Sequence, residues 1–309
     1  MTDLDFGPVV LGGNVFGWTA DRDESFAVLD AFVDAGGRAI DTADVYSEWA
    51  PGNSGGESET IIGEWLASRG RRDDVVIATK VFSLSSRPGL SAANIAAAAE
   101  DSLRRLQTDR IDLYFAHRDD PHVPQEEALQ AFDRLVRDGK VREVGASNFS
   151  ADRLRSAADV AREGGFTPFT VAQDHWSLVA REIEYALVPT LDELGLVEIP
   201  YAALAGGFLT GKYRQGTTVD SARSGSASKH LDDPRKRDLL DVLDDVAAAH
   251  SVSVSAVALA WLRSQPTVAA PIASARTADQ VGPLLESARV ELTPQQLELL
   301  SETTAPVSG

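Results

Sequence analysis

Four polar residues within the first 117 positions have the side chains needed to give a proton to a carbonyl group. They are Asp41, Tyr46, Lys80 and His117. A phenol ordinarily loses its proton near pH 10, so it needs a neighbouring cation to act as an acid near neutrality. An ammonium beside Tyr46 would lower the phenol's pKa, and Asp41 would keep that ammonium charged and oriented. His117 could donate a hydrogen bond to the carbonyl oxygen.

The four side chains include no activated nucleophile and no metal site. The chain has no cysteine, and its five histidines lack the spacing of metal ligands. A reduction at such a site therefore requires a cofactor that carries the reducing equivalent. The sequence predicts no metal.

The elements that must position these residues repeat one unit, a short apolar strand that ends at a polar residue and is followed by a helix. The eight predicted strands are residues 9–12, 39–40, 75–79, 111–116, 141–145, 170–172, 196–200 and 267–272. The predicted helices are residues 25–34, 57–68, 91–106, 125–138, a helix capped by Ser150, 181–194 and 277–287, and a final helix that begins at Thr293 and Pro294. Eight such units in 309 residues predict an α/β protein with one closed (β/α)8 TIM barrel, a single domain over residues 1–309.

Active sites of (β/α)8 barrels lie at the C-terminal ends of the strands. The polar residues expected there are Asp41, Lys80, His117, Ser147, Asn148, Gln173, Tyr201 and Ser274. Any one of them alone would more often be a turn residue, a surface charge or a structural histidine. Asp41, Lys80 and His117, however, follow the neighbouring second, third and fourth strands, so they can point at one spot.

Residues 202–254 interrupt the repeat after the seventh strand, and we expect a long loop with an extra helix. Residues 221–229 at its centre are rich in Ser, Gly and basic side chains, although the chain has a net charge of −18. A segment this long within a compact domain is usually functional or disordered. We expect it either to close over a cofactor or to be mobile.

Composition argues against several classes of partner and predicts a location in the cytoplasm. The strongly negative charge would repel nucleic acid and anionic membranes. The absence of cysteine fits a reducing compartment. The acidic N-terminus does not resemble a secretory signal, and no apolar stretch is long enough to span a membrane. The sequence does not indicate an oligomeric state.

The order of the motifs resembles that of the aldo-keto reductase superfamily over about residues 11–276. The similarity lies in residues 40–43 with Tyr46, residues 79–80, 112–117 and 144–149, and Tyr201 with residues 204–213. It implies that Asp41, Tyr46, Lys80 and His117 form a catalytic tetrad with Tyr46 as the proton donor. Hydride would pass from a nicotinamide to an aldehyde or ketone, and members of the family usually prefer NADPH.

The resemblance also implies a cofactor site. Ser147, Asn148 and Gln173 would hold the nicotinamide carboxamide, and Tyr201 would stack on the ring. Leu204, Gly206 and Lys212 of the strand-seven motif would add further cofactor contacts.

The 2′-phosphate that distinguishes NADP from NAD needs a cation, best an arginine. Residues 274–280, with Ser274, Arg276 and Gln280, follow the eighth strand at a helix N-terminus and resemble the family's phosphate loop. Arg276 is the candidate. Gln280 stands where many relatives carry arginine, and Gly13 in strand one where relatives often have threonine.

Trp18, Trp49 and Trp176 follow strands one, two and six. We expect them to form an aromatic pocket for the substrate, with loop packing as the alternative. Residues 206–212 also fit the start of a phosphate-binding P-loop, but Tyr213 replaces the Ser/Thr that magnesium requires.

The leading prediction is thus an NADPH-dependent reductase of small aldehydes or ketones. One alternative is an NAD(P)-dependent sugar or polyol dehydrogenase that works mainly from alcohol to carbonyl. The other is an NADP-binding redox-sensing subunit with negligible turnover. The sequence does not identify the substrate.

Overall fold

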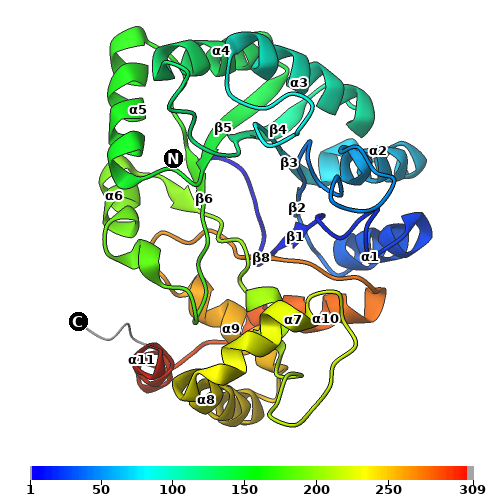
Figure 1. Cartoon of the computed structure of the whole chain (residues 1–309), viewed down its shortest axis with the longest axis vertical. Helices are drawn as coiled ribbons and strands as arrows, with labels where there is room; N and C mark the ends of the chain where they lie inside the picture. The colour runs from blue at the N-terminus through cyan, green and yellow to red at the C-terminus, as the bar shows by residue number, and fades with distance from the viewer. Residues whose placement is uncertain (1, 305–309) are drawn as a thin grey trace.

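The computed structural model describes residues 2–304, and its core is an eight-stranded parallel sheet curled into a barrel (Figure 1). The strands follow the order β7-β6-β5-β4-β3-β2-β1-β8. They are β1 (Val10–Gly12), β2 (Ala39–Asp41), β3 (Val76–Val81), β4 (Ile111–Ala116), β5 (Val141–Ser147), β6 (Val171–Gln173), β7 (Val197–Glu198) and β8 (Ile272–Ala273). The predicted (β/α)8 fold is confirmed.

The seam between β7 and β8 is closed by a short set of backbone contacts. An isolated parallel bridge pairs Glu198 with Val268. The Glu198 N–H donates to Thr267 O at 2.7 Å, and the Ala269 N–H donates back to Glu198 O at 2.8 Å. Of the strand expected at residues 267–272, only Ile272 belongs to β8; Thr267 lies in a turn, Val268 forms the single bridge to Glu198, and residues 269–271 are irregular.

The barrel interior is filled by small and branched side chains from the strands. Leu113, Phe115 and Ile199 belong to this cluster, together with Leu4 and Phe6 from the N-terminal segment. These two residues are almost fully buried, at 8% and 4% exposed. The N-terminal segment thus contributes to the barrel core, which its acidic composition did not suggest.

Helices surround the sheet (Figure 1). They are α1 (Arg22–Asp34), α2 (Glu57–Arg69), α3 (Ala92–Leu106), α4 (Gln125–Arg137), α5 (Ala151–Gly164), α6 (Leu187–Leu194), α7 (Ser224–Ala227), α8 (Pro234–His250), α9 (Val254–Arg263), α10 (Val281–Leu285) and α11 (Pro294–Thr303). Short 3-10 turns are η1 (Arg72–Asp74), η2 (Glu182–Glu184), η3 (Ala205–Thr210), η4 (Ser228–Asp232), η5 (Ala278–Gln280) and η6 (Glu286–Arg289). Ser150 caps α5, and Thr293 caps α11 through a capping box with Gln296.

Two predicted helices are broken in the structure, and a proline accounts for where α6 begins in one and where α10 begins in the other. The helix expected at residues 181–194 is η2 followed by α6, and the one expected at 277–287 is η5, α10 and η6. A proline inside a helix lacks the N–H that bonds four residues back, and its ring clashes with that carbonyl. Pro189 and Pro283 therefore occupy the first turns of α6 and α10, where no such bond is needed.

The segment at 202–254 is mostly helical rather than a long loop. It contains η3, α7, η4 and the 17-residue α8. In Figure 1 these elements gather with α9 and α10 along one side of the barrel. The basic centre noted in the sequence corresponds to α7 and the start of η4.

Between residues 2 and 304, no single helix has the length and apolar character to cross a membrane; α8 and α9 meet that test only as a pair, bent by 93° at their break.

Candidate active site

The four residues predicted to be catalytic come together at the C-terminal ends of three adjacent strands. Asp41 ends β2, Lys80 is the penultimate residue of β3, and His117 directly follows β4. The parallel register places β2 beside β3 and β3 beside β4. Tyr46 reaches the same spot from the turn after β2. Continuous apolar strands that end at polar residues thus set both the barrel and this cluster.

Lys80 is the centre of the cluster. Its side chain is 0% exposed, and its Nζ donates to Asp41 Oδ1 at 2.6 Å, to Thr42 O at 2.7 Å and to the Tyr46 hydroxyl at 3.0 Å. An ammonium has three donors, and all three are used. A buried charge is costly unless it is paired and hydrogen-bonded, and this one is both.

The Tyr46 hydroxyl is held between a cation and an anion. It accepts from Lys80 and donates to Asp41 Oδ2 at 3.2 Å. Burial raises the pKa of the phenol well above its usual value, and the Asp41 charge raises it further. Burial also lowers the pKa of Lys80, while Asp41 opposes that shift. The predicted lowering of the tyrosine's pKa by Lys80 is therefore wrong for this arrangement, because desolvation and Asp41 dominate.

His117 faces the phenol as a neutral imidazole. Its ring centroid is 6.2 Å from that of Tyr46 at an interplanar angle of 73°. Burial lowers the pKa of His117 well below its usual value, and the charges of Lys80 and Arg118 add to this effect. The buried Nδ1 has no partner among the described residues. A neutral ring keeps one N–H to donate and one lone pair to accept.

These residues open onto a cavity of about 830 Å³. Asp41, Tyr46 and His117 line it. Every residue predicted to hold the cofactor also lines it, namely Ser147, Asn148, Gln173, Tyr201, Leu204, Gly206, Lys212, Ser274, Arg276 and Gln280. The volume is in the range that binds small molecules and cofactors.

Asn148 and Tyr201 are tied together on one wall of the cavity. The Tyr201 hydroxyl donates to Asn148 Oδ1 at 2.8 Å, and Asn148 Nδ2 donates to Ser147 Oγ at 2.8 Å. Asn148 has φ +57°, a left-handed conformation that asparagine tolerates better than most residues. Gln173 instead donates from Nε2 to Asp41 Oδ1 at 2.9 Å, which links the predicted carboxamide site to the catalytic cluster.

Part of the cavity lining carries positive charge. Lys212, Arg223 and Arg276 line it, and none of the three has a carboxylate within ion-pair distance in the described chain. Burial and the Arg276 charge lower the pKa of both Lys212 and Arg223. Three unpaired cations that repel one another form a site for an anion of several charges. This matches the phosphates of a dinucleotide, and the residues present therefore fit such a cofactor.

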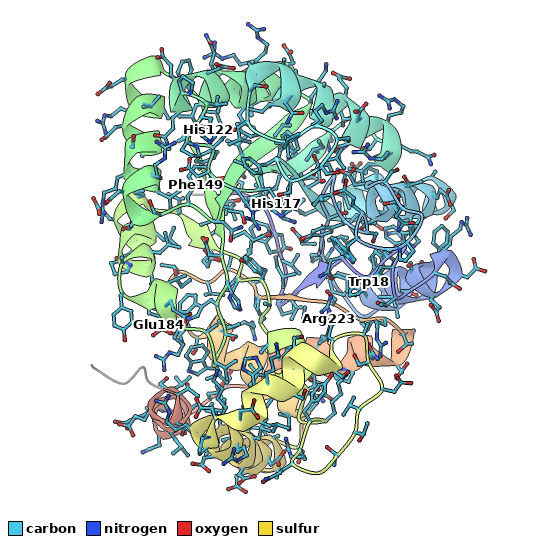
Figure 2. The ribbon with its side chains drawn as sticks, viewed as in Figure 1. Trp18, His117, His122, Phe149, Glu184 and Arg223 are labelled. Atoms are coloured by element: carbon cyan, nitrogen blue, oxygen red, sulfur yellow. The ribbon has the colours of Figure 1, made fainter. Side chains whose placement is uncertain are left out.

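Two of the three tryptophans predicted to form the substrate pocket line the cavity, and the third does not. Trp18 and Trp49 line the cavity, with ring centroids 5.7 Å apart at 87°. Trp176 does not line it: the side chain is 1% exposed, contacts Trp261 and donates from Nε1 to Glu184. The prediction that Trp176 contributes to the substrate pocket is wrong, because its indole turns into the helical layer. Figure 2 shows Glu184, which accepts the hydrogen bond from Trp176, well away from His117.

Asn14, Arg118 and Arg223 also line the cavity, although they were not singled out from the sequence. Asn14 accepts from Ser274 Oγ at 2.8 Å, and Arg118 and Arg223 both line the opening. The basic residues of segment 221–229 were a visible signal for Arg223, but spacing alone could not place it beside Trp18 (Figure 2). In residues 2–304, no group of three or more His, Asp or Glu side chains could hold a metal ion.

A (β/α)8 barrel with an Asp–Lys–Tyr cluster, a neutral histidine and a cationic cavity defines a nicotinamide-dependent oxidoreductase. The family model described as "Aldo/keto reductase family" matches residues 8–305, and the chain belongs to this family.

Its relatives are also oxidoreductases. The chain is 34% identical to an uncharacterized oxidoreductase of Bacillus subtilis over 97% of its own length and 93% of the relative's. It is 30% identical to an aryl-alcohol dehydrogenase [NADP(+)] of Phanerodontia chrysosporium, over 97% and 83% of the two chains. It is 31% identical to a norsolorinic acid reductase of Emericella nidulans, over 98% and 79%.

Proposed function

We propose that the protein is an NADPH-dependent reductase of aryl aldehydes or ketones, with Tyr46 as the proton donor. The observation that carries this proposal is the position of the Tyr46 hydroxyl, 3.0 Å from the Lys80 ammonium and facing His117 on the cavity wall. A nicotinamide bound in the cavity would supply the hydride.

The side chains of the cluster would then donate the proton and stabilise the charge that remains. When negative charge develops on the carbonyl oxygen, that oxygen becomes more basic than a phenolate. The Tyr46 proton then turns from Asp41 toward it. Lys80 stabilises the phenolate that remains, and Asp41 keeps Lys80 in place. His117 donates one ring N–H to the same oxygen.

The raised pKa of Tyr46 makes the phenol a weaker acid than a free tyrosine, so its proton is transferred only once the carbonyl oxygen has become strongly basic. A donor must hold its proton until the reaction needs it, and the buried phenol does so at neutral pH. A neutral His117 likewise avoids placing a second cation next to Lys80.

The preference for NADPH rests on the unpaired cations. Arg276 follows β8, and its backbone N–H donates to Gln280 Oε1 at 2.9 Å, which fixes the start of that turn. Its guanidinium has no ion pair within residues 2–304 and faces the cavity, so it is available for the 2′-phosphate. One relative is named as an NADP(+) enzyme.

The preference for aryl substrates rests on the aromatic wall. Trp49 is 48% exposed, and its ring lies 6.1 Å from that of Tyr46 and 5.7 Å from that of Trp18. Exposed aromatic rings beside the proton donor favour a flat apolar substrate. The names of two relatives, an aryl-alcohol dehydrogenase and a norsolorinic acid reductase, agree with this class.

The test is NADPH oxidation measured against a panel of aromatic aldehydes, aliphatic ketones and sugars. We expect turnover with aromatic aldehydes. Tyr46→Phe should remove most of that turnover, about 100-fold or more, because it deletes a general acid. NADPH binding, followed by fluorescence, should stay within about 3-fold. A Tyr46→Phe enzyme that keeps the wild-type rate would refute the assigned proton donor.

The same assays separate the alternatives. Faster oxidation of an aryl alcohol, sugar or polyol with NADP than reduction of the carbonyl would favour a dehydrogenase. Tight NADPH binding with no turnover on any substrate would favour a redox-sensing subunit. A location in the cytoplasm stays a prediction.

A further inference from the structure

Two tryptophans stand almost at right angles beside Tyr46, each on a different loop. Trp18 belongs to the loop between β1 and α1 (Figure 2), and Trp49 belongs to the loop between β2 and α2. Their ring centroids lie 5.7 Å apart at 87°, and the Trp49 ring lies 6.1 Å from that of Tyr46 at 64°. Because Trp49 is 48% exposed, side-chain packing alone does not fix its position. The backbone of the two loops must therefore hold this aromatic corner, which consists of Trp18, Trp49 and Tyr46.

Asn53 joins the two loops through its side-chain amide. Its Nδ2 donates to Gly17 O and to Ser47 O, each at 2.9 Å. Gly17 directly precedes Trp18, and Ser47 lies two residues before Trp49. An amide nitrogen has two donors, and both are used. One side chain thus ties the backbone before one indole to the backbone before the other.

The backbone at Ser47 needs this support. Ser47 has φ +75°, a left-handed conformation that is unfavourable for a residue with a Cβ atom. Its carbonyl accepts from the Asn53 amide and from the Ala50 N–H, and its hydroxyl donates to Phe16 O at 2.7 Å. Such a conformation persists only where neighbouring contacts over-determine it. Loss of the Asn53 amide would therefore let the turn that carries Trp49 relax.

A separate contact keeps the loop in place without Asn53. Glu48 accepts hydrogen bonds from the backbone N–H and the hydroxyl of Ser85, on the loop after β3. Substitution of Asn53 should therefore loosen the aromatic corner without unfolding the loop. Asn53 is not among the described residues that line the cavity. Any effect of Asn53 on a substrate must then pass through the residues that it holds.

We propose that Asn53 is a positioning residue that sets substrate preference by holding Trp18 and Trp49 at right angles, so that a flat aromatic ring fits into the corner beside Tyr46. This rests on the proposed reductase function and names the feature that makes it selective for aryl substrates. Edge-to-face contacts favour an aromatic ring over a saturated ring of the same size. A corner that is already formed does not have to be ordered by the substrate, so less of the contact energy is lost on binding.

Asn94, at the start of α3, is a matched control. Its Nδ2 also donates to two carbonyls, Arg87 O at 3.1 Å and Gly89 O at 2.6 Å, in the loop between β3 and α3. Asn94 is likewise not among the described residues that line the cavity. Asn53→Ala and Asn94→Ala each remove one amide that bridges two carbonyls, and both should lower the midpoint of thermal unfolding by about 2–6 °C. Only Asn53→Ala should change the substrate preference.

The probes are benzaldehyde and its saturated counterpart, cyclohexanecarbaldehyde. The wild type should show a KM about 5-fold lower for benzaldehyde. Asn53→Ala should raise KM for benzaldehyde by about 5-fold and leave KM for cyclohexanecarbaldehyde within about 2-fold, with NADPH affinity changed by less than about 3-fold. Asn53→Asp keeps the shape but turns both donors into acceptors, so it should lose at least as much. Asn94→Ala should give the wild-type KM for both aldehydes.

A double-mutant cycle tests whether Asn53 acts through the indole of Trp49. In the Trp49→Ala background, Asn53→Ala should change KM for benzaldehyde by less than about 2-fold, because the ring that Asn53 holds is gone. A loss that stays as large in this background would overturn the proposal, and so would a wild-type preference in Asn53→Asp. A fall in the kcat of Asn53→Ala that is the same for both aldehydes would overturn it as well, since Asn53 would then support Tyr46 instead.

Binding without turnover separates this proposal from the proposed function. Methyl benzoate and methyl cyclohexanecarboxylate carry no aldehyde or ketone, and both can be titrated calorimetrically into the enzyme with NADP. Tighter binding of the aromatic ester that Asn53→Ala abolishes and Asn94→Ala retains supports the proposal, even if neither aldehyde is reduced and the reductase assignment fails. Equal binding of the two esters by the wild type overturns it.

Discussion

The backbone N–H of Asn148 donates a 3.0 Å hydrogen bond to Oδ1 of Asp174. Asp174 is buried, and its own backbone accepts from the Tyr201 N–H at 2.9 Å and donates to Glu198 Oε1 at 2.7 Å. One residue thus holds both Asn148 and Tyr201 on the cavity wall. Because these two are predicted to contact the nicotinamide, Asp174 acts as a positioning residue for them.

Asp174→Ala should weaken NADPH binding by about 5-fold to 10-fold, since the partly buried Asn148 N–H loses the acceptor that holds it in place, a loss of about 1 kcal/mol. Asp174→Asn keeps an oxygen acceptor and should retain most of the affinity. Fluorescence titration with NADPH measures both, and Asp192→Ala, at an exposed position on α6, is the control. Wild-type affinity in Asp174→Ala would show that Asn148 needs no such support.

Lys80→Met should lower kcat by about 100-fold to 10,000-fold, because the phenolate of Tyr46 loses its cation. The change also leaves Asp41 as a buried unpaired carboxylate, so the protein should lose stability by about 3–5 kcal/mol. Adding Asp41→Asn should restore much of that stability without restoring activity. Thermal unfolding and NADPH oxidation measured on the single and double variants check this. Recovery of the rate in the double variant would contradict the role given to Lys80.

Arg276→Ala should weaken NADPH binding by about 10-fold to 100-fold and leave NADH nearly unchanged, because a charged hydrogen bond to the 2′-phosphate is worth about 1.5–3 kcal/mol. The KM values for both cofactors, with one aldehyde held constant, give the comparison. Arg289→Ala is a matched control, since Arg289 is exposed and pairs with Glu286 at 3.1 Å. An equal loss of affinity for NADPH and NADH would contradict the proposed contact between Arg276 and the 2′-phosphate.

The barrel and the catalytic cluster were predictable because each depends on a local pattern. An apolar run that ends at a polar residue predicts a parallel strand and its C-terminal end, and three neighbouring ends place Asp41, Lys80 and His117 together. The resemblance to a family supplied the roles.

The features that were wrong or missed depend on tertiary contacts. The direction of the Tyr46 pKa shift depends on how completely the phenol is buried, which the sequence does not report. Whether Trp176 faces the cavity or packs against Trp261 depends on tertiary contacts that the sequence does not report. Arg223 is far from Trp18 in sequence, so nothing local links the two. The breaks at Pro189 and Pro283 are the exception, since both prolines were visible in the sequence.

Asp44 should make stability fall as pH rises. Its carboxylate oxygens are buried and have no partner in the described chain, and burial, with the Glu59 charge, raises the pKa of Asp44 to about 7. A raised carboxyl pKa gives stability that is fully present below the unfolded value near 4 and lost as pH rises toward 7. Asp44→Asn removes this ionisation, so its stability relative to wild type should improve by on the order of 2 kcal/mol between pH 5 and pH 8.

Urea unfolding at the two pH values measures that change. Asp238→Asn, on α8, is an exposed control and should show no such trend. A constant difference between Asp44→Asn and wild type across this range would show that Asp44 stays ionised or reaches water.

Gly63 tests how closely α2 packs against α3. It lies in α2, where a Cβ atom would sit 2.0 Å from Arg105 O and 2.7 Å from the Leu106 carbonyl carbon of α3. These are backbone atoms that cannot move without shifting a helix, so Gly63→Ala should destabilise the protein by about 2 kcal/mol or more despite the better helix propensity of alanine. Gly282→Ala in α10 is the matched control, since nothing lies within 4 Å of its Cβ position. Because Gly282 precedes Pro283, whose ring disfavours a helical residue with a Cβ, the gain in helix propensity is offset and we expect a change of less than about 1 kcal/mol. Thermal unfolding of the two variants decides it: if Gly63→Ala is as stable as Gly282→Ala, α2 and α3 do not approach as closely as the structure shows.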